Sequence, residues 1–255
     1  MNTILSEKFV RIKEKTFSLK TTTTLFSLSL SFYLLFEMKF SADPISRVLH
    51  DRDEIVSAVE KIASTLDAKF GPTAYENVLF LPCMTGAMFF ATDVMRRVYE
   101  KANNDEKTTM MVDVELGSCV ATSYENVDAS GKGGEEVKGV EVKGDVAGKI
   151  VVVIEDIVDT GNTLVALCEK LYALGATDVH CATLLNKQAR RKAECTKAFE
   201  TLLARENKED PEDGLYIGIE CEDEFVVGYG LDYNGAYRCL PHIGVLTEKA
   251  IRGES

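Results

Sequence analysis

The sequence predicts an α/β fold in which helices flank a mainly parallel, twisted sheet. Two patterns lead to this expectation. The continuous, largely β-branched run from Ile150 to Ile154 is typical of a parallel strand that is covered on both faces. A helical pattern from Leu164 to Leu174 and a second apolar run from Val179 to Leu185 follow it, which is the order of a βαβ unit. We therefore expect the central strand at Ile150 to Ile154.

The other elements follow from hydrophobic periodicity. In chain order, the expected elements are a helix from Asp51 to Phe70 ended by Gly71-Pro72, a strand from Asn77 to Leu81, a turn from Cys83 to Gly86, a helix from Ala87 to Tyr99 and a strand from Thr108 to Leu116. The stretch from Gly117 to Gly148 is rich in Gly, Lys and Glu and shows little periodicity. We expect it to form a long mobile loop that closes over a site.

The composition is that of a globular protein with one sizeable core. The 255 residues are 45% hydrophobic, and 29 basic against 41 acidic residues give a net charge of −12, so we expect no nucleic-acid partner. The seven cysteines form no Cys-x-x-Cys pair, which argues against a disulfide framework and a thiolate zinc site. A reducing, cytoplasmic location fits this cysteine usage. Any metal should be a hard ion held by carboxylates.

The first 37 residues differ from the rest. The uncharged stretch from Thr21 to Phe36 follows a mildly basic segment and contains an apolar run interrupted by serines. This run is shorter than the roughly 20 residues of a membrane span. We expect residues 1–37 to be a targeting segment, which would direct the chain to an organelle, or a disordered extension. Residues 38–255 are then one domain.

Three carboxylates, Glu155, Asp156 and Asp159, follow the central strand. In a βαβ unit, ligands bind at the carboxyl end of the strand and at the start of the helix, where N–H groups attract anions. Glu155 and Asp156 can accept hydrogen bonds from vicinal sugar hydroxyls, directly or through hydrated magnesium. Residues 160–163, Thr-Gly-Asn-Thr, offer N–H and hydroxyl donors to a phosphate. The pattern predicts a ribose-phosphate site, with Asp159 facing the anomeric carbon or the base.

This loop, V-I-E-D-I-V-D-T-G-N-T at residues 153–163, resembles the phosphoribosyl pyrophosphate signature of type I phosphoribosyltransferases, in the form of the hypoxanthine-guanine members. The segments 184–187 (L-L-N-K) and 225–234 (F-V-V-G-Y-G-L-D-Y-N) resemble the purine-binding parts of the same subfamily. The resemblance covers about Val78 to Leu246. It implies the type I fold, with a small hood and a flexible lid loop.

The resemblance also implies a reaction. Members of the subfamily are purine-salvage enzymes that use magnesium and transfer 5-phosphoribosyl from phosphoribosyl pyrophosphate to N9 of hypoxanthine or guanine, releasing pyrophosphate. A homodimer or homotetramer is expected. The residues implied for ribose phosphate are Glu155, Asp156, Ile157, Val158, Thr160, Gly161, Asn162 and Thr163. Those implied for pyrophosphate and the lid are Cys83, Met84, Thr85, Gly86, Ser123, Tyr124 and Arg238.

The remaining implied roles concern the base and the metal. Asp159 handles the proton at purine N7, and Lys187 donates to the 6-oxygen. Phe225 stacks on the ring and the backbone of Val226 binds its edge. Asp232 approaches the 2-substituent. The implied magnesium ligands are Glu155, Asp156 and Asp232.

Two departures from the family pattern leave alternatives open. Met84 and Asn162 stand where many members have lysine, so weaker pyrophosphate binding or a preference for xanthine is an alternative. The resemblance also places a cis peptide between Cys83 and Met84. A non-catalytic phosphoribosyl pyrophosphate-binding regulator could share the fold. An aspartic-protease interpretation of V-D-T-G at 158–161 conflicts with the helix expected directly after it.

Overall fold

The computed structural model describes residues 44–104, 113–127, 133–191, 193, 195 and 214–253. Ile45–Leu246 form one compact unit, and a second unit includes the described residues Pro44 and 247–253. The expected targeting segment or extension, residues 1–37, lies outside the described residues. No helix within the described ranges is long and apolar enough to cross a membrane.

The second unit contains one described helix, α7 (Glu248–Arg252). The hydroxyl of Thr247 accepts a hydrogen bond from the N–H of Ala250 at 3.1 Å, which caps this short helix.

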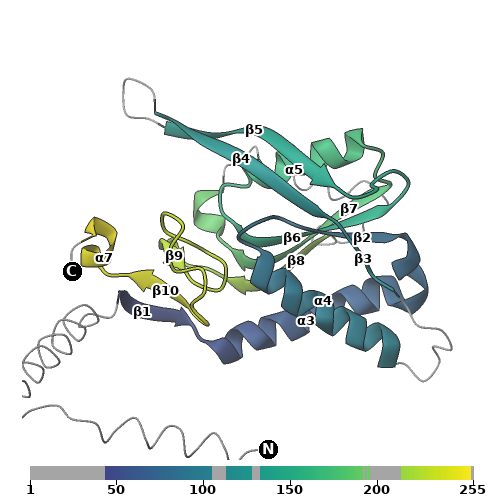
Figure 1. Ribbon diagram of the computed structural model, residues 1–255, viewed down its shortest axis with the longest axis horizontal. Helices are drawn as coiled ribbons and strands as arrows, with labels where there is room; N and C mark the ends of the chain where they lie inside the picture. Colours follow the sequence, from purple (N-terminus) through teal and green to yellow (C-terminus); the bar gives the residue numbers. More distant parts are fainter. Residues whose placement is uncertain are drawn as a thin grey trace, which may run out of the picture. The chain divides into compact units, whose positions relative to one another are not determined.

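A five-stranded parallel sheet forms the centre of the unit Ile45–Leu246, with strand order β3-β2-β6-β7-β8 (Figure 1). Its strands are β2 (Val78–Pro82), β3 (Glu115–Leu116), β6 (Ile150–Val158), β7 (Asp178–Asn186) and β8 (Leu215–Glu220). The middle strand, β6, contains the apolar run expected at the centre, and its residues 151–154 are fully buried. The α/β prediction with a mainly parallel sheet is thus confirmed.

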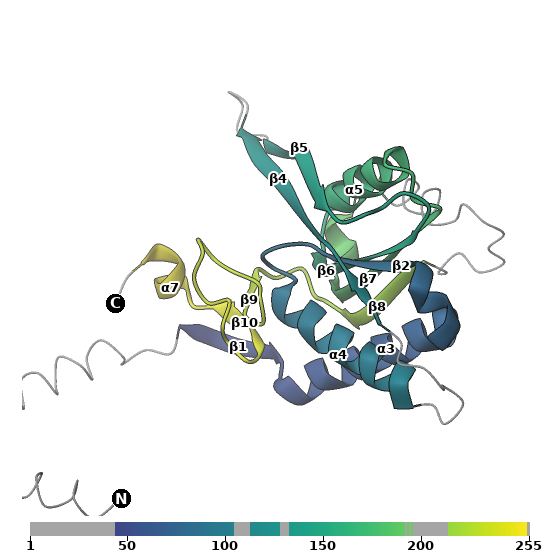
Figure 2. The ribbon, with the colours of Figure 1, turned by 45° about the vertical axis from the view of Figure 1, so that its right-hand side comes forward.

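Helices cover both faces of this sheet, as Figures 1 and 2 show. On one face, α3 (Arg52–Ala74) and α4 (Met88–Asn104) pack against alternate strand residues such as Phe80 and Val152. On the other face, α5 (Asn162–Ala173) packs against the intervening residues, such as Leu81 and Val153. Because strand side chains alternate between faces, a continuous apolar run is needed to fill both cores.

The long helix α3 begins with a capping box, in which Asp51 accepts from the N–H of Glu54 and the Glu54 side chain accepts from the N–H of Asp51. Its regular part ends at Gly71, whose φ of 63° is non-helical, where the sequence predicts the end. Helical residues resume after this kink up to Ala74, followed by the 3-10 turn η1 (Tyr75–Asn77).

The stretch expected as a long irregular loop is instead a two-stranded antiparallel hairpin, formed by β4 (Ser118–Val127) and β5 (Gly133–Lys143). Its pairing is formed by backbone groups, which all residue types share, so the hydrophobic pattern does not reveal it. Near its base the hairpin contacts the core through Cys119, Val140 and Val142. A strand is expected from Thr108 to Leu116. The structure describes residues 113–116 of this stretch, and the last two of them form β3.

A smaller antiparallel sheet, the hood, has the order β1-β10-β9. It consists of β1 (Ile45–His50), β9 (Val226–Val227) and β10 (Ile243–Leu246). The hydroxyl of Tyr229 donates to Asp93 on α4 at 2.6 Å, and the backbone of Gly230 lies so close to the carbonyl of Gly86 that a Cβ would be 1.9 Å from this oxygen. These contacts fix the hood above the carboxyl ends of β2 and β6.

Candidate active site

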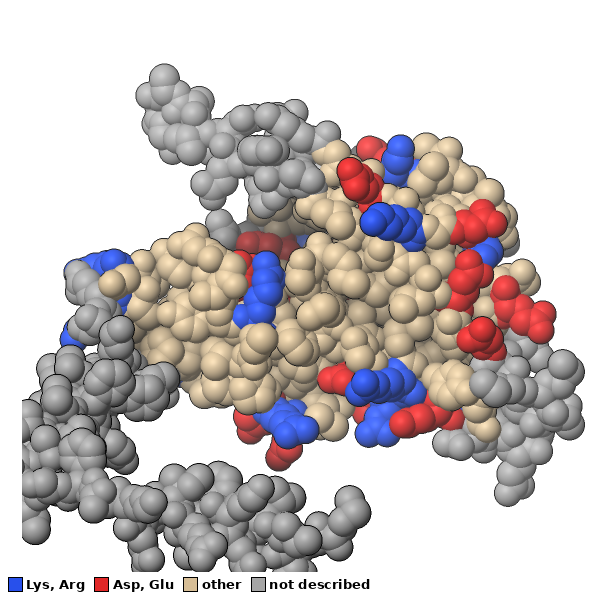
Figure 3. Space-filling model, viewed as in Figure 1, with Lys and Arg blue, Asp and Glu red and all other residues tan. Residues whose placement is uncertain are grey.

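A cavity of about 480 Å³ lies where the carboxyl ends of β2, β6 and β7 face the hood. Figure 3 shows a hollow in this region with acidic side chains at its bottom and a basic side chain at its rim. The residues that line the cavity are Cys83, Met84, Thr85, Gly86, Ala121, Glu155, Asp156, Ile157, Asp159, Thr163, Lys187, Phe225, Val226, Leu231, Asp232 and Arg238. Most of the residues expected in the site therefore share one cavity.

The remaining loop residues lie beside it. Val158, Thr160 and Gly161 line an adjoining hollow of about 260 Å³, together with Glu155, Ile157, Asp159, Thr163 and Leu164. Its floor is the start of α5, where free N–H groups and the helix dipole favour an anion. Asn162 is directed elsewhere: its Oδ1 accepts from Cys195 Sγ at 3.0 Å.

Two expected lid residues, Ser123 and Tyr124, belong to β4, but their side chains lie outside the described part. On the same strand, Ala121 lines the cavity. The assignment of the Ser-Tyr pair to the lid stays a prediction.

Near the end of β6, Asp156 and the Oε2 atom of Glu155 are buried. Burial and the neighbouring Asp156 raise the pKa of Glu155, and burial also raises the pKa of Asp156. Glu155 Oε2 has no hydrogen-bond partner among the described residues. A buried carboxylate oxygen without a partner is costly, so this pair is suited to a ligand that brings hydroxyl donors or a cation.

Magnesium fits this pair. Within the described ranges, no three His, Cys, Asp or Glu side chains converge on a metal position. Magnesium does not need such a cage, because it keeps several waters and binds through one or two carboxylates plus substrate oxygens. Asp232 is less available: Oδ1 lies 2.6 Å from Arg238 Nη2, and Oδ2 accepts from the N–H of Gly235 at 2.6 Å.

Lys187 and Asp159 face the same cavity because they directly follow adjacent parallel strands, β7 and β6. The Lys187 side chain is 5% exposed, and its Nζ lies 3.9 Å from Asp159 Oδ2. The backbone N–H of Lys187 donates to the carbonyl of Val158 at 2.9 Å, which extends the pairing of the two strands beyond their ends.

Phe225 is an aromatic side chain presented to the cavity rather than to a core. It is 53% exposed, and its ring makes an edge contact with Tyr233, with centroids 5.6 Å apart. The next residue, Val226, starts β9 and pairs with Val245 of β10. A ring that is half exposed and makes this one T-shaped contact leaves a face for stacking against a planar ligand.

The loop between β2 and α4 presents donors to the cavity. The N–H groups of Cys83 and Met84 donate to the carbonyls of Ile154 and Cys119, whereas those of Thr85 and Gly86 have no acceptor among the described residues. The cis peptide lies between Met84 and Thr85, not between Cys83 and Met84.

Sequence reasoning missed four neighbours of the site. Asp223 Oδ1 lies 3.8 Å from Lys187 Nζ, Cys119 Sγ lies 3.1 Å from Cys83 Sγ, and Ala121 and Leu231 line the cavity. For Asp223, the only sequence signal is its position two residues before Phe225. For Cys119, no local pattern reveals a contact with a residue 36 positions away.

The comparisons with known proteins agree with this geometry. Residues 47–203 match the phosphoribosyl transferase domain. The chain belongs to this family. A hypoxanthine-guanine phosphoribosyltransferase from Bacillus subtilis is 31% identical over 202 residues, which cover 79% of this chain and 93% of that protein. This chain is therefore a phosphoribosyltransferase of the hypoxanthine-guanine kind.

Two further relatives extend this comparison. The bifunctional protein TilS/HprT of Listeria monocytogenes is 34% identical over 205 residues, and the match spans 79% of this chain but only 26% of that protein. A crystal structure of a hypoxanthine phosphoribosyltransferase from Staphylococcus aureus superimposes with a TM-score of 0.59 at 25% identity and covers 81% of this chain and 94% of that one. The type I phosphoribosyltransferase fold is thus confirmed, and the parallel sheet excludes the aspartic-protease alternative.

Proposed function

We propose that the chain is a purine-salvage enzyme that transfers 5-phosphoribosyl from phosphoribosyl pyrophosphate to N9 of hypoxanthine or guanine. The observation that carries this proposal is the single cavity that contains the acidic residues at the end of β6, Lys187 and Phe225. A regulator that senses only phosphoribosyl pyrophosphate has no need for a buried lysine and a presented aromatic ring in the same cavity. We therefore favour the enzyme over the regulator.

We assign each part of the substrate to one of the two hollows. The 5-phosphate binds at the start of α5, against the N–H and hydroxyl groups of Thr160 and Thr163. The ribose hydroxyls donate to Glu155 and Asp156. The pyrophosphate accepts hydrogen bonds from the N–H groups of Thr85 and Gly86 and from the Arg238 guanidinium, which has five N–H groups.

The purine binds between Lys187 and Phe225. The Lys187 ammonium donates to the 6-oxygen, which selects against adenine because a 6-amino group cannot accept this proton. Phe225 stacks on the ring, and Asp159 exchanges the proton at N7 as the base becomes attached. Asp232 and the Val226 backbone are placed to contact the 2-position.

As the bond from C1 to pyrophosphate breaks, positive charge develops on the sugar and negative charge on the leaving group. Glu155 and Asp156 hold the ribose, while Arg238 and the loop amides stabilise the pyrophosphate. Magnesium, held by Glu155 and Asp156 with a further contribution from Asp232, would supply additional positive charge to the pyrophosphate oxygens. We assign to the hairpin of β4 and β5, which contains Ser123 and Tyr124, the role of excluding water from the reactive sugar.

The test is an assay of the full chain with magnesium, phosphoribosyl pyrophosphate and one base at a time: hypoxanthine, guanine, xanthine or adenine. We expect nucleoside monophosphate from hypoxanthine and guanine and none from adenine. Higher kcat/KM with xanthine would establish the xanthine alternative, and binding of phosphoribosyl pyrophosphate without product from any base would establish the regulator. Gel filtration of the same sample tests the expected dimer or tetramer.

A further inference from the structure

The segment that joins β8 to the hood, residues 221–225, is anchored at both ends. At its start, the N–H of Cys221 donates to the carbonyl of Asn186 at 2.9 Å, one residue before Lys187. At its end, Val226 pairs with Val245 in the hood sheet. The segment therefore runs past the purine end of the cavity between two fixed points.

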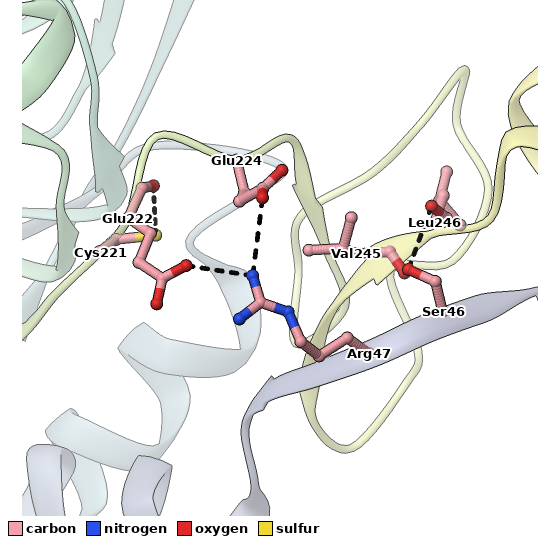
Figure 4. Close-up of polar contacts among 7 residues, drawn as sticks. All are labelled: Ser46, Arg47, Cys221, Glu222, Glu224, Val245 and Leu246. Atoms are coloured by element: carbon pink, nitrogen blue, oxygen red, sulfur yellow. Dashed lines mark hydrogen bonds and ion pairs between the residues drawn. The ribbon is translucent and has the colours of Figure 1, made fainter.

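Within this segment, a tight turn is centred on Asp223. The N–H of Glu224 donates to the carbonyl of Glu222 at 2.8 Å, which brings these two residues together. On one side of the turn, Arg47 Nη2 from β1 lies 3.0 Å from Glu222 Oε2 and 3.5 Å from Glu224 Oε1, as Figure 4 shows. One guanidinium thus holds the acidic side chains that flank Asp223.

Asp223 itself approaches Lys187 instead. The Lys187 ammonium lies between two carboxylates, with Nζ 3.8 Å from Asp223 Oδ1 and 3.9 Å from Asp159 Oδ2. Both distances exceed those of direct hydrogen bonds, so the ammonium donates a hydrogen bond to neither carboxylate. A buried ammonium held between two opposite charges keeps its donors available for a ligand.

We propose that Asp223 is a positioning residue for recognition of the 6-oxygen. It draws the Lys187 ammonium away from Asp159, so that Lys187 donates to the purine and the Asp159 carboxylate stays available to N7. This inference rests on the proposed function and adds a residue to it. A neutral side chain at position 223 would leave Asp159 as the stronger attraction, and the ammonium would close the gap to form a direct ion pair with it. The purine would then have to break this pair before binding.

The experiment compares the full chain with the variants Asp223→Asn and Asp223→Glu, each also in the Lys187→Ala background. Asp145→Asn, an exposed residue outside the cavity lining, is the matched control. The readouts are KM for the 6-oxopurine, KM for phosphoribosyl pyrophosphate, and kcat.

For Asp223→Asn we expect KM for the 6-oxopurine to rise by about tenfold, the effect of weakening the one charged hydrogen bond from Lys187 to the 6-oxygen. We expect KM for phosphoribosyl pyrophosphate to stay unchanged. Asp223→Glu should restore most of this loss. In the Lys187→Ala background, Asp223→Asn should have no further effect, because its action passes through Lys187.

Three results overturn the inference: an unchanged KM for the base in Asp223→Asn, an equal rise in both KM values, or the same loss with and without Lys187. Each of them requires that the wild type and Asp145→Asn convert a 6-oxopurine. A wild type that converts none contradicts the proposed function itself, so the two failures are distinguishable.

Discussion

Gly86 is a residue at which a very small substitution should cause a large loss of activity. A Cβ at this position would lie 1.9 Å from Asp156 Oδ2, whereas ordinary contacts begin at 3.4 Å, so Gly86→Ala requires a shift of about 1.5 Å. On its other side the loop has little room, because the carbonyl of Gly86 lies close to the backbone of Gly230. The Asp156 carboxylate must therefore move.

A displacement of about 1 Å at a binding group costs about 10²-fold in rate, so we expect kcat/KM for phosphoribosyl pyrophosphate to fall by about this factor. Steady-state kinetics measure it, and circular dichroism checks that the variant is folded. Asp145→Asn, at an exposed position outside the cavity lining and outside the hairpin, is again the control. A folded Gly86→Ala variant with activity within about threefold of wild type would refute the packing argument.

Three further substitutions test the site and the core. Asp159→Asn should lower kcat by about 10²-fold, the effect of losing a general acid or base, while KM for phosphoribosyl pyrophosphate is kept; loss of binding alone would contradict the role at N7. Lys187→Ala should reduce the ratio of kcat/KM for hypoxanthine over adenine, and unchanged purine kinetics would show that Lys187 does not contact the 6-oxygen. Leu167→Ala, at a fully buried position of α5, should lower the free energy of unfolding by about 2–5 kcal/mol, as measured by urea denaturation. Leu174→Ala, at a position that is 40% exposed, should lower it less. Equal effects of the two substitutions would count against the assigned core.

The parts of the fold that the sequence predicts are those whose hydrophobic pattern is set by two-sided burial. The residues from Ile150 to Ile154 are all apolar because α5 covers one face of β6, and α3 and α4 cover the other. The same reasoning does not predict the hairpin of β4 and β5 or the short hood strands. These strands are stabilised by backbone pairing, which in the case of β1 and β10 joins residues about 200 positions apart in the sequence. Such pairing produces no recognisable hydrophobic pattern in the local sequence.

The site divides in the same way. Residues 155–163 are contiguous and carry their chemistry from the end of β6 to the start of α5, so they are predictable from the sequence. Lys187 and Phe225 were found through the family resemblance, and the adjacent carboxyl ends of β6 and β7 explain why Lys187 faces Asp159. Asp223 was missed because its role depends on a turn and on Arg47 from the distant strand β1, contacts that only the folded chain brings together.

The central claim is that one cavity binds the ribose phosphate and the purine side by side. A crystal structure of the full chain with magnesium and guanosine monophosphate tests it most directly. We expect the phosphate at the start of α5, the ribose against Glu155 and Asp156, and the base between Lys187 and Phe225. Nucleotide bound with its base away from Lys187, or at another surface, would contradict the claim.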